Sequence, residues 1–257
     1  MDQVLFYVIL VIWLIPFTFG VERIRTGDGI LHTCLDGVKH KIEPGPEAEL
    51  FNQCTPWKQR SCCTNATAES LHGNGHYNFN YDHCPHIKNM SSACRRHFIQ
   101  DTCFYECSPN VGPWIVKVNM KIRKERFFEV PLCASDCKAW FDACKYDYTC
   151  NVNWIRGWKW TKGGNECPAD SMCHTFEEMY RTPEDFCEKV WDHSWKVTPD
   201  SEPCMRLWFD GEAGNPNDAV ARHYLRMMRH GTFGRSHIAN LNIKLLILPL
   251  VVLLLKS

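Results

Sequence analysis

The sequence lacks an excess of charge of either sign. Its 29 lysines and arginines balance 29 aspartates and glutamates, so the formal net charge is +0. A nucleic-acid-binding surface or a polybasic membrane patch needs a local concentration of positive charge, and no block of like charge is present. The composition therefore argues against nucleic acid as a partner.

The sequence also lacks the short motifs that mark common catalytic centres. It contains no Gly-x-Ser-x-Gly elbow, no His-Glu-x-x-His and no phosphate-binding loop. Its 12 histidines are scattered, and none is spaced to complete a zinc site with the nearby cysteines. We therefore predict that the chain is not an enzyme and holds no metal or cofactor.

The chain begins with an apolar segment that is typical of a secretory signal. Residues 1–20 end in small residues and precede a charged run, although Asp2 stands where a positive charge is usual. This pattern predicts a signal peptide cleaved after Gly20. An uncleaved anchor helix is the alternative.

A second apolar segment, 245–255, lies close to the end of the sequence. As a helix it spans only about half of a hydrocarbon core of roughly 30 Å. Small residues upstream, a polar spacer and this tail predict a glycosylphosphatidylinositol (GPI) attachment signal, 231–257, with Gly231 or Gly234 as the attachment residue. We expect a mature domain, 21–230, on the outer face of the cell membrane, with a shed form besides. A tail-anchored helix is the alternative.

All 16 cysteines lie between Cys34 and Cys204, inside the predicted mature segment. An even number in a secreted chain predicts up to eight disulfides. Asn65 and Asn89 begin Asn-x-Ser/Thr sequences, so both are predicted glycosylation sites at the surface. We predict one α+β, mainly helical, disulfide-rich globular domain with long irregular loops and a few short strands.

Local patterns place the elements of this domain. Caps and helical periodicity predict helices over 44–54, 91–107, 135–147, 182–191 and 218–228. The polar segment 64–78 is predicted to be a loop that bears a glycan. Short strands are predicted over 127–132 and 205–209.

The predicted helix 91–107 has a carboxylate on an otherwise apolar stripe. At 100° per residue, Cys94, Phe98, Asp101 and Tyr105 fall together. An ionised Asp101 among such neighbours would be costly unless it were paired. The stripe therefore faces solvent, or Asp101 pairs with an arginine, or a ligand completes it.

Two other segments have both a structural and a functional interpretation. Arg-Lys-Glu-Arg at 123–126 is either a solvated charged face or a pair of planar donors for a ligand. The segment 154–160 contains three tryptophans and Arg156. It packs in the core, or it forms an aromatic slot for a flat heterocycle with a cation beside it.

Several longer motifs then identify a family resemblance. His-Phe-Ile-Gln-Asp-Thr-Cys-Phe-Tyr-Glu-Cys-Ser-Pro-Asn at 97–110, Arg-Lys-Glu-Arg at 123–126, Val-Pro-Leu-Cys at 130–133 and Gly-Asn-Pro-Asn at 214–217 resemble the folate receptors. The similarity runs from about Leu31 to Met228 and includes every cysteine. It implies a receptor that binds folic acid and reduced folates and takes them up by endocytosis.

The resemblance also implies roles for individual residues. Asp101 would accept hydrogen bonds from the pterin ring, which Tyr77 and Trp191 would sandwich. The other pterin heteroatoms would bond Arg123, Arg126 and Ser194. Completing the apolar wall would be Phe79, Tyr81, Tyr105 and Trp154. Lining the route to the glutamate carboxylates would be Arg156, Trp158 and Trp160.

The family pairing of cysteines would be Cys34–Cys62, Cys54–Cys103, Cys63–Cys107, Cys84–Cys173, Cys94–Cys144, Cys133–Cys204, Cys137–Cys187 and Cys150–Cys167. The chain departs from the family pattern at three positions toward the glutamate end: Ile122 replaces a tryptophan, Ile155 a histidine and Arg156 a lysine. We expect folate recognition to survive with an altered affinity or an altered preference among folate forms.

Two relatives provide alternatives. Juno, the egg-surface member of the family, serves sperm recognition through a cell-surface protein partner and lacks the pterin-end aspartate, whereas this chain has Asp101. Riboflavin-binding protein is secreted without a lipid anchor, which the apolar tail here disfavours. Both comparisons favour vitamin binding at a membrane.

Overall fold

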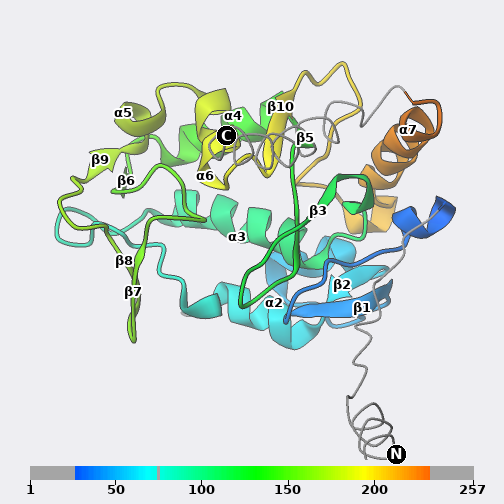
Figure 1. Ribbon diagram of the computed structural model, residues 1–257, viewed down its shortest axis with the longest axis horizontal. Coiled ribbons are helices and arrows are strands. Elements are labelled where there is room, and N and C mark those ends of the chain that lie inside the picture. Colours follow the sequence, from blue (N-terminus) through cyan, green and yellow to red (C-terminus); the bar gives the residue numbers. More distant parts are fainter. Residues whose placement is uncertain (1–26, 74–75, 232–257) are drawn as a thin grey trace, which may run out of the picture.

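The computed structural model describes residues 27–73 and 76–231. The predicted signal peptide, Gly234 and the apolar tail lie outside the described residues. Helix α3 (Ser92–Cys107) runs through the middle, with α4 (Ala134–Cys144) and α6 (Pro183–Val190) on one side (Figure 1). On the other side lies α2 (Asn65–His72). In the described part of the chain, no helix combines the length and hydropathy needed to cross a bilayer.

Helix α3 organises the domain because it is held at its ends and buried on most of its surface. The side chain of Ser91 caps it by accepting a hydrogen bond from the backbone N–H of Cys94. Phe98 and Phe104, on different faces, are both fully buried. Three disulfides join this helix to other segments. Cys103 is bonded to Cys54, Cys107 to Cys63, and Cys94 to Cys144 of α4.

Within residues 27–73 and 76–231 the strands are short and pair in five separate two-stranded sheets. Four pairs are antiparallel: β1 (His40–Gly45) with β2 (Ser61–Cys63), β3 (Ile115–Lys117) with β4 (Glu125–Phe127), β6 (Tyr148–Thr149) with β9 (His174–Thr175), and β7 (Lys159–Thr161) with β8 (Gly164–Glu166). The fifth pair, β5 (Val130–Cys133) with β10 (Trp195–Thr198), is parallel and opposes Trp195 to Val130. This pair brings Trp195 into the core beside α3.

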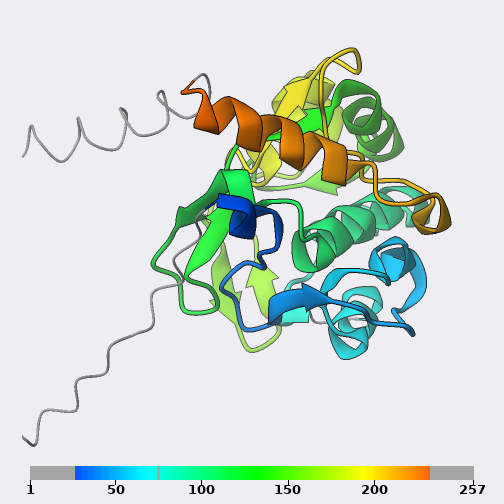
Figure 2. The same cartoon turned by 90° about the vertical axis from the view of Figure 1, so that its right-hand side faces the viewer.

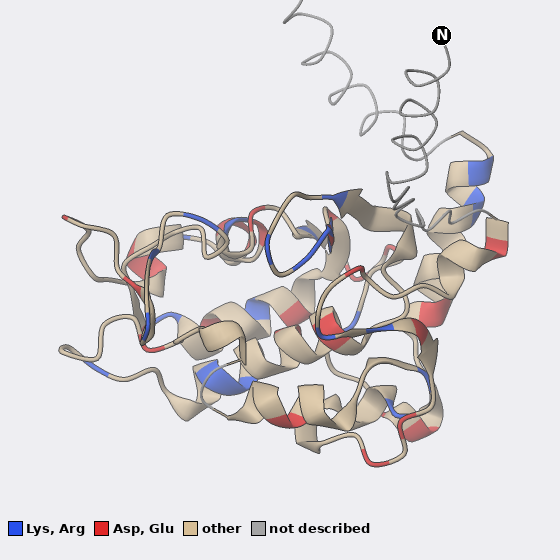
Figure 3. Cartoon of the chain, turned by 60° about the horizontal axis from the view of Figure 1, so that its bottom comes forward, with Lys and Arg blue, Asp and Glu red and all other residues tan. Residues whose placement is uncertain are grey.

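The remaining helices complete the outside of the domain. They are α5 (Phe176–Tyr180), α7 (Asn217–Arg229) and the 3-10 turns η1 (Gly27–Leu31), η2 (Asn52–Trp57), η3 (His76–Asn78), η4 (Gly112–Trp114) and η5 (Gly211–Ala213). Helix α7 packs on η1 and η4, so the last described helix contacts the first described turn (Figure 2). Basic and acidic positions are both scattered over the ribbon in Figure 3.

The predicted mixed fold, mainly helical with short strands, is confirmed, and so are four of the predicted helices. They are α3, α4, α6 and α7, with ends that differ from the predicted ones by a few residues.

Three element predictions were wrong. The helix over 44–54 is the end of β1, a turn and the start of η2. The prolines at 44 and 46 favour extended backbone in the residues before them, which lie in β1. The loop over 64–78 begins with helix α2, which buries Ala68 and Leu71. The strand over 205–209 is reduced to a single bridge from Met205 to Leu132. The predicted strand over 127–132 divides into β4 and β5 at Glu129, whose φ is 53°.

All 16 cysteines are paired, and the eight disulfides are the same pairs that the resemblance implies. They join residues 17 to 89 positions apart, and each contributes roughly 2–4 kcal/mol by restricting the unfolded chain. Of the two predicted glycosylation sites, Asn89 is exposed. Asn65 is half-buried, and its amide Nδ2 donates to Glu69 Oε1 at 2.8 Å.

Candidate ligand-binding site

Asp101 lies in the buried middle of α3. The residue is only 4% exposed, and its Oδ1 accepts a hydrogen bond from Trp195 Nε1 at 2.8 Å. The stripe therefore does not face solvent, and within the described residues no arginine pairs with this carboxylate. The third interpretation, a carboxylate that a ligand completes, is the one that the geometry leaves open.

Burial raises the pKa of Asp101 to about 7. The hydrogen bond from the indole N–H of Trp195 opposes this rise in pKa. The indole N–H of Trp191 also opposes it, although this N–H completes no hydrogen bond among the described residues. A carboxylate with such a pKa gains strongly from any further donor that reaches it. A ligand with N–H groups could supply that donor.

Trp195 is a site residue that the sequence analysis missed. It is fully buried, with its ring 4.9 Å from Phe104 and 5.1 Å from Phe127. A buried tryptophan usually finds an acceptor for its N–H, so the tryptophan itself is the only signal in the sequence. The sequence does not show that the acceptor lies 94 residues away.

The predicted aromatic residues come together around Phe79. Its ring centroid lies 5.2 Å from Tyr81, 5.8 Å from Trp154 and 6.0 Å from Trp191. Trp158 at 5.9 Å and Trp160 at 6.3 Å extend the cluster outward, and Trp160 is 56% exposed. The segment 154–160 thus packs in the core at one end and reaches solvent at the other, so both interpretations of it apply in part.

Tyr77 lies on another side of the site. Its φ is 52°, and its ring contacts His76 at 4.3 Å. Burial raises the pKa of its phenol, and the negative charge of Glu106 raises it further. Among the described ring contacts none joins Tyr77 to Trp191, so their role as a pair around a ligand stays a prediction.

The two predicted arginines have different surroundings. Arg123 Nη1 donates to Tyr105 Oη at 2.6 Å, while its Nε is buried without a hydrogen-bond partner in the described chain. Arg126 donates to the carbonyls of Trp191 at 3.2 Å and Asp192 at 2.7 Å. Arg123 therefore has a donor free for a ligand, whereas Arg126 mainly holds the backbone that follows α6.

Ser194 joins the same turn. Its buried Oγ donates to the carbonyl of Trp191 at 2.8 Å. Arg126 and Ser194 therefore converge on the backbone of Trp191 and fix the position of its ring. Their first role in this structure is to position an aromatic wall.

A buried polar cluster lies beside these residues and was also missed. Glu106 is fully buried, with His76 Nε2 at 3.0 Å from Oε1 and His40 Nε2 at 3.4 Å from Oε2. Burial alone would raise the pKa of Glu106, but His40, His76 and Arg123 together lower it. The carboxylate is therefore ionised and can only accept hydrogen bonds.

Both ring nitrogens of His76 contact a polar side chain. Its Nδ1 lies 2.8 Å from Ser70 Oγ, and its Nε2 lies 3.0 Å from Glu106 Oε1. Because the ionised carboxylate can only accept, Nε2 donates this hydrogen bond. A buried hydrogen bond between the ring of His76 and the carboxylate of Glu106 therefore lies next to Tyr77.

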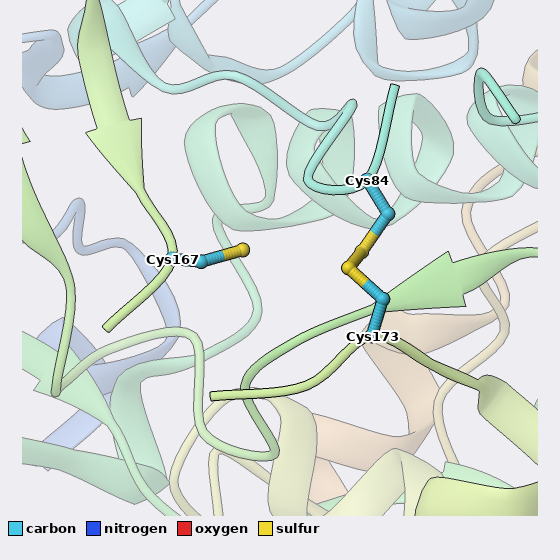
Figure 4. Close-up of side chains that lie close together, drawn as sticks. All are labelled: Cys84, Cys167 and Cys173. Atoms are coloured by element: carbon cyan, nitrogen blue, oxygen red, sulfur yellow. A yellow bond between two sulfur atoms is a disulfide. The ribbon is translucent and has the colours of Figure 1, made fainter. Parts of the chain in front are cut away.

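The described residues offer one close group of metal-ligand atoms. The sulfurs of Cys84, Cys167 and Cys173 all lie within 4.8 Å of one another. Figure 4 shows Cys84 bonded to Cys173, with the side chain of Cys167 directed toward that bridge. Cys167 is itself bonded to Cys150, so none of the three is a thiolate that could hold a metal.

Comparisons with known proteins identify the family to which the chain belongs. The model of the folate receptor family matches residues 33–206. The chain is similar to folate receptor gamma of Homo sapiens, with 48% identity over 217 residues that cover 82% of this chain and 87% of that protein. It is similar to folate receptor alpha of Bos taurus, with 46% identity over 84% of this chain and 92% of that protein.

A more distant similarity links the chain to a second group of vitamin-binding proteins. It is 32% identical to riboflavin-binding protein of Dromaius novaehollandiae, over 76% of each chain. The family match covers more than half of the sequence and includes Asp101, Arg123, Arg126 and Trp191. The chain therefore belongs to the folate receptor family.

Proposed function

We propose that this chain binds folic acid and reduced folates at the cell surface, without chemical turnover, and delivers them by endocytosis. The observation that supports this most strongly is a buried carboxylate, Asp101, that accepts from the indole of Trp195. The Nε of Arg123 is likewise buried and has no hydrogen-bond partner in the described structure. Buried polar groups are nearly always hydrogen-bonded, so such a donor favours a ligand that accepts from it.

In the proposed complex the pterin ring enters first. Its N–H and amino groups donate to Asp101, and a ring heteroatom accepts from Arg123. Tyr77 and Trp191 cover the two faces of the ring, with Arg126 and Ser194 fixing Trp191 from behind. The wall is completed by Phe79, Tyr81, Tyr105 and Trp154, and the glutamate end leaves past Arg156, Trp158 and Trp160.

Two of the three departures from the family pattern replace a polar or aromatic ring by isoleucine at this outer end. Ile122 and Ile155 are both half-buried, and neither offers a side-chain hydrogen bond. The pterin end has its polar residues, so the proposal places any change of affinity at the glutamate end.

Equilibrium binding of labelled folic acid to cells that display the full chain tests this proposal. Saturable, tight binding is expected. No binding to cells that display the protein would overturn the proposed function and favour adhesion through a cell-surface protein partner. Release of the protein by a phosphatidylinositol-specific phospholipase tests the proposed GPI anchor at Gly231 or Gly234 in the same cells.

Binding is expected to weaken as the pH falls below about 7. The ligand donates to the ionised form of Asp101, whose pKa in the free protein is about 7. Below that pH the site must first release a proton, so the dissociation constant rises by up to about tenfold per pH unit. Measurements between pH 7.5 and 5.5 check this.

The variant Asp101→Asn provides the control. It lacks the carboxylate that titrates, so its weaker binding should not depend on pH over this range. A flat dissociation constant in the natural protein over this range would contradict the assignment of Asp101 to the site.

A further inference from the structure

Asp192 lies between two residues of the proposed site but belongs to none of the predicted contacts. Its carboxylate Oδ2 is 2.7 Å from Arg156 Nη2 and 3.6 Å from Arg126 Nη2. Its Oδ1 accepts from Asn153 Nδ2 at 2.8 Å. The side chain is only 16% exposed. Three donors therefore surround one carboxylate at the point where the glutamate end of the ligand would leave.

The backbone holds this carboxylate in place. Asp192 and His193 have φ values of 52° and 60°, in the left-handed region that residues with a Cβ rarely adopt. Arg126 stabilises this turn by donating to the carbonyls of Trp191 and Asp192. The position of the carboxylate is thus fixed by the end of α6 and by a buried arginine.

Asp192 is ionised at neutral pH. Burial alone would raise its pKa, but the donor on Asn153 and the guanidinium groups of Arg126 and Arg156 lower it below the usual range. The charge of Arg156, whose side chain is 73% exposed, is therefore already balanced within the protein.

A ligand carboxylate that approaches Arg156 would also approach Asp192. The attraction to the guanidinium and the repulsion from the carboxylate act over similar distances, in a region open to water, so they largely cancel. The outer end of the site then gains little from the negative charge of a glutamate tail.

We propose that Asp192 is a specificity-determining residue that makes binding insensitive to the charge of the ligand's tail, so that the ring system decides affinity. This inference rests on the proposed function and names the ligand class within it: pterin compounds with weakly charged tails bind as well as folic acid. Polyglutamate forms gain nothing from their added carboxylates.

The test compares folic acid with pteroic acid, which has the same ring system but lacks the glutamate. Both dissociation constants are measured on the full chain for the natural protein, Asp192→Asn and Asp185→Asn. Asp185 is the matched control, because it is a carboxylate of α6, the helix that precedes Asp192, and it pairs with Lys189.

The natural protein is expected to bind the two ligands within about threefold of each other. Asp192→Asn keeps the shape but frees Arg156, so its affinity for folic acid should rise about three- to fivefold, as one exposed charge pair allows. Pteroic acid should change less than about twofold, and Asp185→Asn should change neither.

Equal effects of Asp192→Asn on both ligands would overturn the inference while leaving the proposed function intact. No binding of either ligand to the natural protein would overturn both. If Asp192→Asn fails to reach the surface, the salt dependence of the natural protein decides. Parallel salt dependences for the two ligands support a neutral outer end, and a steeper one for folic acid contradicts it.

Discussion

Replacement of Asp101 by alanine is expected to weaken folic acid binding by at least tenfold, a loss of more than about 1.4 kcal/mol. Hydrogen bonds to a charged group contribute roughly 1.5–3 kcal/mol each, and the ligand's donors would be left unpaired in a buried site. Because Asp101 is buried beneath aromatic rings, water cannot easily replace it. Equilibrium binding to displayed protein measures the loss.

Asp101→Asn separates binding from folding. The amide oxygen can still accept from Trp195, but the charge is lost. Between pH 3.8 and about 7 the native state holds a proton that the unfolded state has released, so this group lowers stability as the pH rises through that window. Asp101→Asn should therefore bind weakly yet unfold no more easily than the natural protein at pH 8.

A second buried carboxylate provides the matched control. Asp147 is 2% exposed and accepts from Ser91 Oγ, outside the proposed site. Asp147→Asn should lower the unfolding temperature without changing the dissociation constant. Unchanged affinity in Asp101→Ala, with the control also unchanged, would remove Asp101 from the site.

The largest effect on stability is expected from Glu106→Leu. This change leaves the Nε2–H of His76 buried without its acceptor, and an unsatisfied buried donor costs about 1–3 kcal/mol. Chemical denaturation at neutral pH with the disulfides intact measures the free energy of unfolding. Since Tyr77 and Arg123 adjoin the pair, ligand binding should weaken as well.

The double variant Glu106→Leu, His76→Leu is the companion experiment. Replacing both partners by apolar residues removes the buried unpaired donor, so much of the loss should be recovered. Additive losses would show that the two side chains do not stabilise each other.

Acidification is expected to remove the contribution of Glu106 to the free energy of unfolding. The folded pKa of Glu106 is lowered, so its contribution to stability is fully present above its ordinary value of 4.5. It is lost as the pH falls through the lower folded pKa.

Helices with clear ends were predictable from the sequence. Helix α3 has a serine cap before it and Ser108-Pro109 after it, and both signals are local. Helix α2 was missed because its sequence is polar and its stability comes from burying Ala68 and Leu71 against distant segments. Short strands such as β10 form where disulfide-linked segments meet, which local patterns do not encode.

The site was predictable only in its residue types. Periodicity put Asp101 and Tyr105 on one stripe of a helix, and the family motif supplied the remaining residues. Neither could show that Asp101 meets Trp195, or that Asp192 balances Arg156. Such pairings depend on how turns that are distant in the sequence pack together, so only the structure shows them.

The crowding of sulfur atoms around Cys167 bears on how the protein is made. During oxidation, Cys84 and Cys173 each have two reachable partners and Cys167 has three, since its native partner is Cys150. Thiolates exchange by attacking a neighbouring disulfide. A wrong bond to Cys167 would leave Cys150 without its partner, and the loop between residues 150 and 167 would no longer be closed by a disulfide. Preparations from a reducing host, or from simple air oxidation, should therefore contain inactive isomers that an isomerase and a glutathione buffer convert to the native form.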